Sequence, residues 1–215
     1  MPTATANCNG MNIASEIAKR LLQIKAIKLS PQKPFTWASG ILSPIYCDNR
    51  IVLSNPEARD FVKQCLVEKS KDFGNFSAVA GVATAGIAHG MLLADALGLP
   101  FAYVRAKAKD HGRQNRIEGE LLPGSKVLLV EDLISTGGSS LSAVEALRDA
   151  RLEVVGTLAI FSYNFEKANK AFEDAGCRLE TLSNYDVLVR EALASKYINL
   201  IDVDMLTTWR SKAGA

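Results

Sequence analysis

The sequence predicts an α/β fold in which a central, mostly parallel sheet is flanked by helices on both faces. Short apolar runs typical of buried strands alternate along the chain with longer segments of helical periodicity, which is the pattern of βαβ units. The 215 residues, of which 48% are hydrophobic, are enough to bury a sizeable core. Because no repeat, low-complexity tract or linker divides the chain, we expect a single domain over residues 1–215.

Each element follows from a local pattern. Asn55 and Pro56 are a cap and a first-turn residue that open one helix, and Gly98 with Pro100 ends the next one. Apolar residues at helical spacing predict helices over 12–29, 55–71, 85–97, 141–151, 165–175 and 186–198. Short apolar runs predict strands over 77–82, 101–105, 127–130, 154–161 and 178–182.

Residues 30–50 interrupt this alternation. They are rich in proline, serine and aromatic residues, and their apolar residues follow neither a helical nor a strand pattern. We expect hood elements over residues 12–50 that form a small N-terminal hood outside the central sheet.

Composition excludes several classes of protein. The formal net charge of +2 gives no support for binding nucleic acid or a membrane surface, and no apolar run approaches the ~20 residues of a spanning helix. The polar N-terminus does not resemble a secretory signal. The four cysteines are Cys8, Cys47, Cys65 and Cys177. They are scattered, without the spacing of a zinc site or a disulfide framework, which indicates a reducing cytoplasm.

The most informative stretch is Val127-Leu-Leu-Val-Glu-Asp-Leu-Ile-Ser-Thr-Gly-Gly-Ser-Ser140. A buried strand leads to two acids, Glu131 and Asp132, and a loop of small hydroxyl and glycine residues then opens a helix. Such a loop turns its N–H groups toward an anion, and the helix start adds its positive end. In a parallel sheet, ligands bind beyond the carboxyl ends of the strands, which is where this motif is expected.

The acids restrict the ligand. Neither a dinucleotide glycine motif nor a P-loop is present, and carboxylates beside a phosphate cradle would repel a bare polyphosphate. They suit a sugar diol, whose hydroxyls donate to carboxylates, or a divalent cation nearby. The alternative is an ordinary strand–turn–helix connection. Any single residue of the motif is compatible with that alternative, but the motif as a whole is not typical of it. The motif therefore indicates a phosphorylated ribose.

This stretch closely resembles the motif of the type I phosphoribosyltransferases that binds 5-phosphoribosyl-1-diphosphate (PRPP). The resemblance implies their fold, PRPP as substrate and Mg²⁺ as cofactor, with no direct metal ligand but with the ion near the two acids. It assigns the ribose hydroxyls to Glu131 and Asp132. The 5-phosphate would lie against the loop, and the full PRPP-binding stretch would be Glu131, Asp132, Leu133, Ile134, Ser135, Thr136, Gly137, Gly138 and Ser139.

A second segment, residues 105–119, is densely cationic and has no apolar period. Alone, it would be read as a solvated surface. Beside a phosphoribose site it has the charge that a departing diphosphate needs. It resembles the catalytic loop of the family's orotate-specific members, which implies that Arg105, Lys109 and His111 bind PRPP and that Lys109 and His111 are catalytic. In that family the loop serves the neighbouring subunit, so the resemblance also implies a homodimer with shared sites.

Two further segments resemble the same enzymes. The stretch from Phe35 to Arg50 resembles their hood motif, and its aromatic residues suit a flat anionic base. We therefore expect Tyr46 of this stretch to bind orotate, together with Ser135 of the phosphate loop. An aromatic packing corner is the alternative for any one residue. The stretch from Gly81 to Ala88 resembles the diphosphate loop, although its glycines also suit close packing.

The sequence departs from some orotate enzymes in ways that bear on base specificity. Ala38, Leu42 and Ala85 stand where those enzymes carry lysines, and Ser162-Tyr163-Asn164 occupies the region of a base-binding arginine. The function that the sequence favours is phosphoribosyl transfer from PRPP to orotate in pyrimidine (UMP) biosynthesis. A purine-base phosphoribosyltransferase and a non-catalytic PRPP-binding regulator remain as alternatives.

Overall fold

The computed structural model describes residues 12–36, 40, 42–107 and 116–214. Its centre is a six-stranded sheet with the order β10-β9-β8-β5-β6-β7. Neighbouring strands are parallel except β7, which is antiparallel to β6. The predicted mostly parallel sheet is therefore confirmed. Its strands are β5 (Ala78–Val82), β6 (Phe101–Val104), β7 (Ile117–Glu118), β8 (Lys126–Ile134), β9 (Glu153–Ser162) and β10 (Leu179–Asn184).

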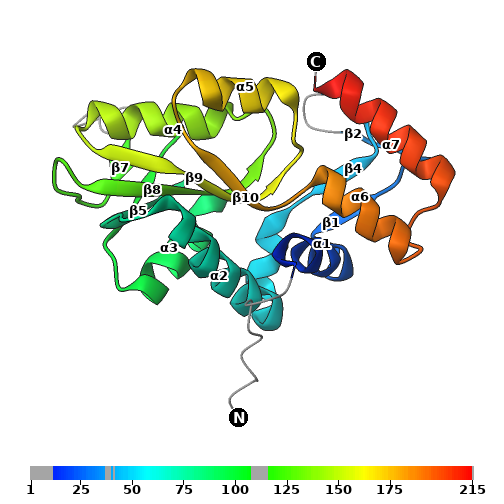
Figure 1. The fold of residues 1–215 in the computed structure, drawn as a ribbon, viewed down its shortest axis with the longest axis horizontal. Coiled ribbons are helices and arrows are strands. Elements are labelled where there is room, and N and C mark those ends of the chain that lie inside the picture. Colours follow the sequence, from blue (N-terminus) through cyan, green and yellow to red (C-terminus); the bar gives the residue numbers. More distant parts are fainter. Residues whose placement is uncertain (1–11, 37–39, 41, 108–115, 215) are drawn as a thin grey trace, which may run out of the picture.

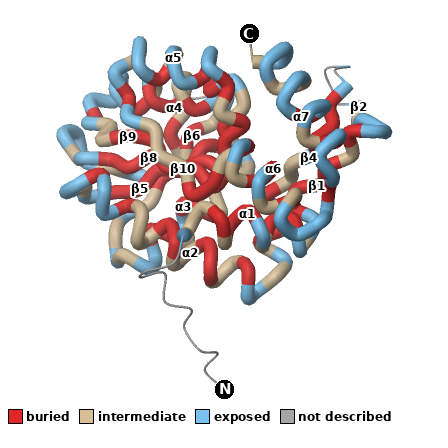
Figure 2. The backbone as a smooth tube through the Cα atoms, turned by 45° about the vertical axis from the view of Figure 1, so that its right-hand side comes forward, coloured by how far each residue is buried: buried red, intermediate tan, exposed pale blue. Residues whose placement is uncertain are grey.

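Helices cover both faces of this sheet (Figure 1). α2 (Pro56–Ser70) and α3 (Ala85–Leu97) lie on one face, and α4 (Gly138–Asp149) and α5 (Glu166–Asp174) lie on the other. Buried residues concentrate in the strands between these layers (Figure 2). Strands that are covered on both faces require continuous apolar runs, which explains why the sequence predicted these strands from their apolar runs.

Two helices begin or end where the sequence predicted. α2 starts at Pro56, and the Asn55 side chain caps it by accepting a hydrogen bond of 3.0 Å from the Ala58 N–H. α3 ends at Leu97 because Gly98 adopts a left-handed φ of 65°, which glycine tolerates.

The order of the strands creates a switch point between β5 and β8. The chain passes from β5 through α3 to β6 on one side, whereas β8 leads through α4 to β9 on the other. The two connections diverge from neighbouring strand ends. They leave a crevice at the carboxyl edge of the sheet, where ligands bind in folds of this kind.

Hood strands stand apart from the central sheet, as expected. They form two small antiparallel pairs, β1 (Ile27–Leu29) with β4 (Ile45–Cys47) and β2 (Phe35–Thr36) with β3 (Leu42–Ser43). The predicted helix over 12–29 is wrong in its last part, because α1 (Ile13–Gln23) stops before Lys25 adopts a left-handed φ of 59°. Residues 27–29 pair with β4 instead.

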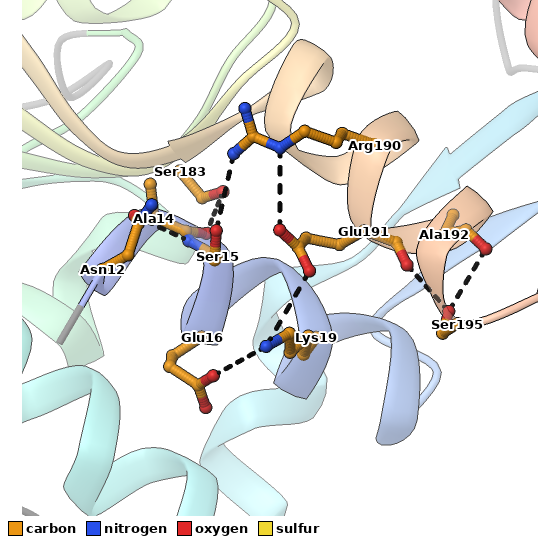
Figure 3. A network of polar contacts seen from close by, with 10 residues as sticks. All are labelled: Asn12, Ala14, Ser15, Glu16, Lys19, Ser183, Arg190, Glu191, Ala192 and Ser195. Carbon is orange, nitrogen blue, oxygen red and sulfur yellow. Dashed lines mark hydrogen bonds and ion pairs between the residues drawn. The ribbon is translucent and has the colours of Figure 1, made fainter.

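α1 is fixed against α6 (Tyr185–Ala194) and the end of β10 by polar contacts (Figure 3). The Ser183 hydroxyl donates to the Ala14 carbonyl at 2.7 Å, and Lys19 lies 3.8 Å from Glu191. These contacts join the N-terminal helix to the edge strand of the sheet.

The C-terminal end differs from the expectation. The predicted helix over 186–198 is α6, which ends at Ala194, and a further helix, α7 (Leu200–Ala213), was not predicted. α7 opens with a capping box between Asn199 and Asp202. It contacts the hood, because the Trp209 indole N–H donates to the Leu42 carbonyl at 3.1 Å and the Gln32 amide donates to Asp202 at 2.9 Å.

Across the described ranges, no helix has the length and apolar character needed to cross a membrane.

Candidate active site

A cavity of about 280 Å³ opens at the switch point, between the carboxyl ends of β5 and β8. One wall follows β5, and the other is the acid and hydroxyl/glycine motif that the sequence singled out. The lining residues are Ala83, Thr84, Ala85, Glu131, Asp132, Leu133, Ser135, Thr136, Gly137, Gly138, Ser139 and Ser140. Most of the predicted PRPP-binding stretch therefore surrounds one cavity. Ile134 is the exception, since its side chain is buried in the core.

The acid pair lies within β8, not after it. The predicted strand over 127–130 ends too early, because β8 continues to Ile134 through pairing with the long strand β9. Pairing with β5 stops at Gly81 and Val130. From Glu131 to Ile134, β8 is therefore paired on one side only, with β9, and this part of the strand carries both acids.

Glu131 is almost wholly buried, with 6% of its surface exposed. One carboxyl oxygen accepts a hydrogen bond from the Asp132 N–H at 3.0 Å, and the other accepts from the Ser140 hydroxyl at 3.3 Å. Burial and the neighbouring Asp132 carboxylate raise the pKa of Glu131 to about 8. A carboxyl group that keeps its proton at neutral pH can both donate to and accept from a hydroxyl.

Asp132 has a different environment. Burial also raises the pKa of Asp132, but the hydrogen bond with Glu131 and the positive charge of Arg50 oppose that rise. The Asn49 side chain donates to the Asp132 carbonyl at 2.7 Å. The two acids therefore differ in what holds them, although they are adjacent in the sequence.

The loop after β8 has the geometry of an anion site. Gly137 adopts a φ of 82° and caps α4 without a side-chain hydrogen bond, so the first turn of this helix faces the cavity without a capping side chain. A β-carbon at Gly137 would also lie 2.8 Å from the Phe172 ring. The helix begins at Gly138, three residues before the predicted start at Leu141, so Gly138, Ser139 and Ser140 form its first turn. The Ser140 hydroxyl donates its hydrogen bond to Glu131.

On the β5 side, the glycines serve packing. A β-carbon at Gly86 would lie 2.5 Å from the Val130 carbonyl, and one at Gly81 would lie 2.8 Å from the Gly86 carbonyl. The absence of these side chains lets α3 approach β5 and β8 closely. Only the tip of this segment, Ala83–Ala85, lines the cavity, and the Ala83–Thr84 peptide bond there is cis.

A second hollow of about 280 Å³ adjoins the first and shares Ala83, Gly138 and Ser139 with it. Arg105 and Arg116 line this hollow. Their main chains are joined by a bond of 2.8 Å from the Arg105 N–H to the Arg116 carbonyl, and the Arg116 side chain donates to the Arg105 carbonyl at 2.9 Å. Two cations are thus held beside the start of α4.

Lys109 and His111, the predicted catalytic residues, lie outside the described residues. Arg105 and Arg116 lie on either side of the undescribed range 108–115, so two cations of the predicted segment 105–119 line the second hollow.

Tyr46 does not line either hollow. It lies on β4, is 39% exposed, and has its ring 5.8 Å from that of Phe35 and 6.0 Å from the Lys28 ammonium group. The hood motif reaches the acid pair through Asn49, which donates to the Asp132 carbonyl at 2.7 Å, and the charge of Arg50 opposes the rise in the pKa of Asp132. Neither residue was singled out from the sequence. They directly follow Tyr46-Cys47-Asp48 in that motif, so their position in the hood was the available signal.

Among the described residues, no cluster of three histidine, cysteine or acidic side chains could hold a metal ion by itself. The available donors are Glu131 and Asp132. This set fits Mg²⁺, which is commonly bound through one or two carboxylates together with substrate phosphates and water.

Comparison with known proteins gives concordant matches. Residues 49–196 match the family model of the phosphoribosyl transferase domain. Orotate phosphoribosyltransferase of Listeria innocua is 52% identical over 201 residues, covering 93% of this chain and 96% of that protein. The Cytophaga hutchinsonii enzyme of the same name is 50% identical, covering 95% of this chain and 98% of that one.

Solved structures agree. The crystal structure of orotate phosphoribosyltransferase from Aeropyrum pernix has a TM-score of 0.73 and 30% identity, and the match covers 81% of this chain and 97% of that one. The Mycobacterium tuberculosis enzyme in complex with PRPP has a TM-score of 0.66 and 26% identity, covering 82% of this chain and 98% of that one.

Proposed function

Because the chain belongs to the phosphoribosyl transferase family and, within it, to the orotate phosphoribosyltransferases, we propose that it transfers the 5-phosphoribosyl group of PRPP to orotate. The products are orotidine 5-phosphate and diphosphate, on the route to UMP. The observation that carries this proposal is the convergence of a buried acid pair and a helix-start anion loop on one cavity at the switch point. The first suits a ribose diol and the second suits its 5-phosphate.

In the reaction, the bond between ribose C1 and the diphosphate oxygen breaks, and a bond from C1 to orotate N1 forms. Glu131 and Asp132 take the ribose hydroxyls, and Ser135–Ser139 hold the 5-phosphate, so C1 is fixed in place. Arg105, Lys109 and His111 stabilise the charge of the departing diphosphate. Arg116 joins this group, because it lines the same hollow as Arg105. Ser135 and Tyr46 contact orotate.

We propose Mg²⁺ as the cofactor, held chiefly by PRPP oxygens close to Glu131 and Asp132. When bound, it neutralises part of the diphosphate charge. Orotate is already an anion, so a strong general base is not required. The N1 proton of orotate passes to solvent.

The active unit is a homodimer with shared sites, in which the loop that carries Lys109 serves the neighbouring subunit. We place the enzyme in the cytoplasm, in keeping with the scattered cysteines, of which Cys47 and Cys177 are free thiols. Its substrates are small molecules, and the net charge of +2 gives no reason to expect a nucleic-acid partner.

The test is the loss of orotate absorbance when PRPP and Mg²⁺ are added to the purified protein. We expect consumption of orotate that requires both additions and that is not inhibited by an excess of adenine or hypoxanthine. Transfer to a purine base instead would identify a purine-base enzyme. Binding of PRPP without consumption of any base would identify a regulator.

A further inference from the structure

Asn49 is a fully buried polar residue that joins the hood to the acid-bearing strand. It begins the 3-10 helix η1 (Asn49–Ser54), directly after the hood strand β4, and none of its surface is exposed. Its amide nitrogen donates to the Asp132 main-chain carbonyl at 2.7 Å, across 83 residues of sequence. Its amide oxygen lies 3.5 Å from the Cys47 thiol, which donates to it. Both polar ends of the side chain are therefore engaged.

The position of this contact on β8 gives it more than a packing role. Pairing with β5 stops at Val130, so the segment that carries the acids is held by β9 alone among the strands. The hydrogen bond from Asn49 adds a separate restraint to the peptide of Asp132. The charge of the adjacent Arg50 opposes the rise in the pKa of Asp132 that burial causes, so a second residue of η1 acts on Asp132.

We propose that Asn49 is a positioning residue for PRPP binding: it holds the main chain of Asp132 so that the acid pair meets the ribose hydroxyls. The inference rests on the proposed function, because it needs the acid pair to bind ribose. Asn49 itself need not touch the substrate, and its effect passes through Asp132.

A double-mutant cycle tests this inference. Asn49→Leu keeps the branched shape of the side chain and removes the amide, and Asn49→Ala serves if the larger leucine prevents folding. We expect Asn49→Leu to raise the KM for PRPP by about 5-fold with kcat changed less than about 2-fold, because the acids bind ribose in both the ground state and the transition state. Ser43→Ala is the matched control. It removes another fully buried hood hydroxyl, which donates to the Ile45 carbonyl at 2.8 Å and accepts from the Ile45 N–H at 3.3 Å, and it should leave the KM for PRPP unchanged.

The cycle is completed in the Asp132→Asn background. If Asn49 acts through Asp132, its removal there should change the KM for PRPP less than about 2-fold, because the group that it positions is already impaired. An equal effect in both backgrounds, or no effect in the wild-type background, would overturn the positioning role alone. Wild-type PRPP kinetics in Asp132→Asn would instead overturn the ribose assignment, and this inference with it.

Discussion

At the residue scale, the acid pair shows how neighbours in sequence acquire different properties. Glu131 is buried, accepts two hydrogen bonds and keeps its proton to about pH 8. Asp132 is partly exposed to the cavity and lies within the influence of Arg50. We infer that Asp132 is the stronger acceptor for a ribose hydroxyl, whereas Glu131 can also act as a donor.

The first prediction concerns Asp132→Asn. The substitution keeps the shape of the side chain and should keep the fold. It should raise the KM for PRPP by about 10-fold or more, since a charge-assisted hydrogen bond contributes about 1.5–3 kcal/mol. Steady-state kinetics at saturating orotate measure the change, with circular dichroism as the check on folding. PRPP kinetics like those of the wild type would contradict the role given to this carboxylate.

The second prediction uses the raised pKa of Glu131. Its ordinary pKa is 4.5, which is the value expected for the unfolded chain, whereas the folded protein keeps the proton to about pH 8. Between these values the folded state binds more protons than the unfolded state, so the free energy of unfolding should fall as pH rises through this window. Glu131→Gln removes the titrating group and should make this fall shallower.

Urea denaturation of the ligand-free wild type and Glu131→Gln at several pH values between about 5 and 8 measures the difference. Asp132 titrates in both proteins, but its pKa depends on the hydrogen bond with Glu131, so the difference between the two curves reports the loss of Glu131 together with this coupling. Parallel curves would show that Glu131 is not the group responsible.

At the element scale, the sequence predicted those features that local chemistry decides. The capped start of α2 at Asn55-Pro56 and the end of α3 at Gly98 were both legible, because a cap and a left-handed glycine act within one turn. The acid and glycine motif could be recognised in the sequence because its residues are contiguous. Each of these residues has its structural partner within a few positions in the chain.

Features that depend on distant partners were missed. β8 extends past the acids because β9 continues beside it, and 27–29 is a strand because β4 lies opposite. α7 has no apolar stripe, since only Asp202 and Leu206 are buried along it, and its capping box was the one local signal. The contact from Asn49 to Asp132 spans 83 residues and has no local trace in the sequence.

The third prediction concerns α7 and the hood. The Trp209 indole N–H bonds to the Leu42 carbonyl of β3, and its ring packs within 6.1 Å of Phe165 and Tyr185, measured between ring centroids. Trp209→Phe retains an aromatic ring and removes the donor. Because the hood is proposed to bind the base, we expect the KM for orotate to rise by about 2- to 10-fold, from a net loss of about 0.5–1.5 kcal/mol. The Kd for PRPP should stay unchanged.

Ser211→Ala is the matched control on the same helix, because its hydroxyl bonds only to the Thr207 carbonyl within α7 among the hydrogen bonds described. It should leave both constants at wild-type values. An equal loss of PRPP and orotate binding in Trp209→Phe would indicate general destabilisation and not a specific effect on the hood.

At the scale of the whole molecule, the site is assembled from segments that the sheet brings to one edge. Ala83–Ala85 follow β5, the acid and anion motif lies on β8 and the start of α4, and Arg105 follows β6. The three strands are neighbours in the order β8-β5-β6, so their carboxyl ends meet. Parallel topology thus explains why residues separated by tens of positions face one another.

The last prediction tests whether the catalytic unit is a pair of chains. Lys109→Ala removes the loop cation and leaves the cradle intact, whereas Asp132→Asn impairs the cradle and leaves the loop intact. If the loop serves the neighbouring subunit, a mixed dimer holds one complete site, built from the loop of the Asp132→Asn chain and the cradle of the Lys109→Ala chain. Random exchange makes about half of the dimers mixed, each with one good site of two, so activity should recover to about a quarter of the wild-type value.

The measurement is orotate consumption after the two variants are mixed, with native mass spectrometry of differently tagged chains to confirm exchange. Each variant incubated alone under the same conditions is the control and should keep its low activity. If exchange is demonstrated and activity stays at the average of the two variants, the loop serves its own subunit. A single-chain mass in native spectra of the active protein would show that no dimer is required.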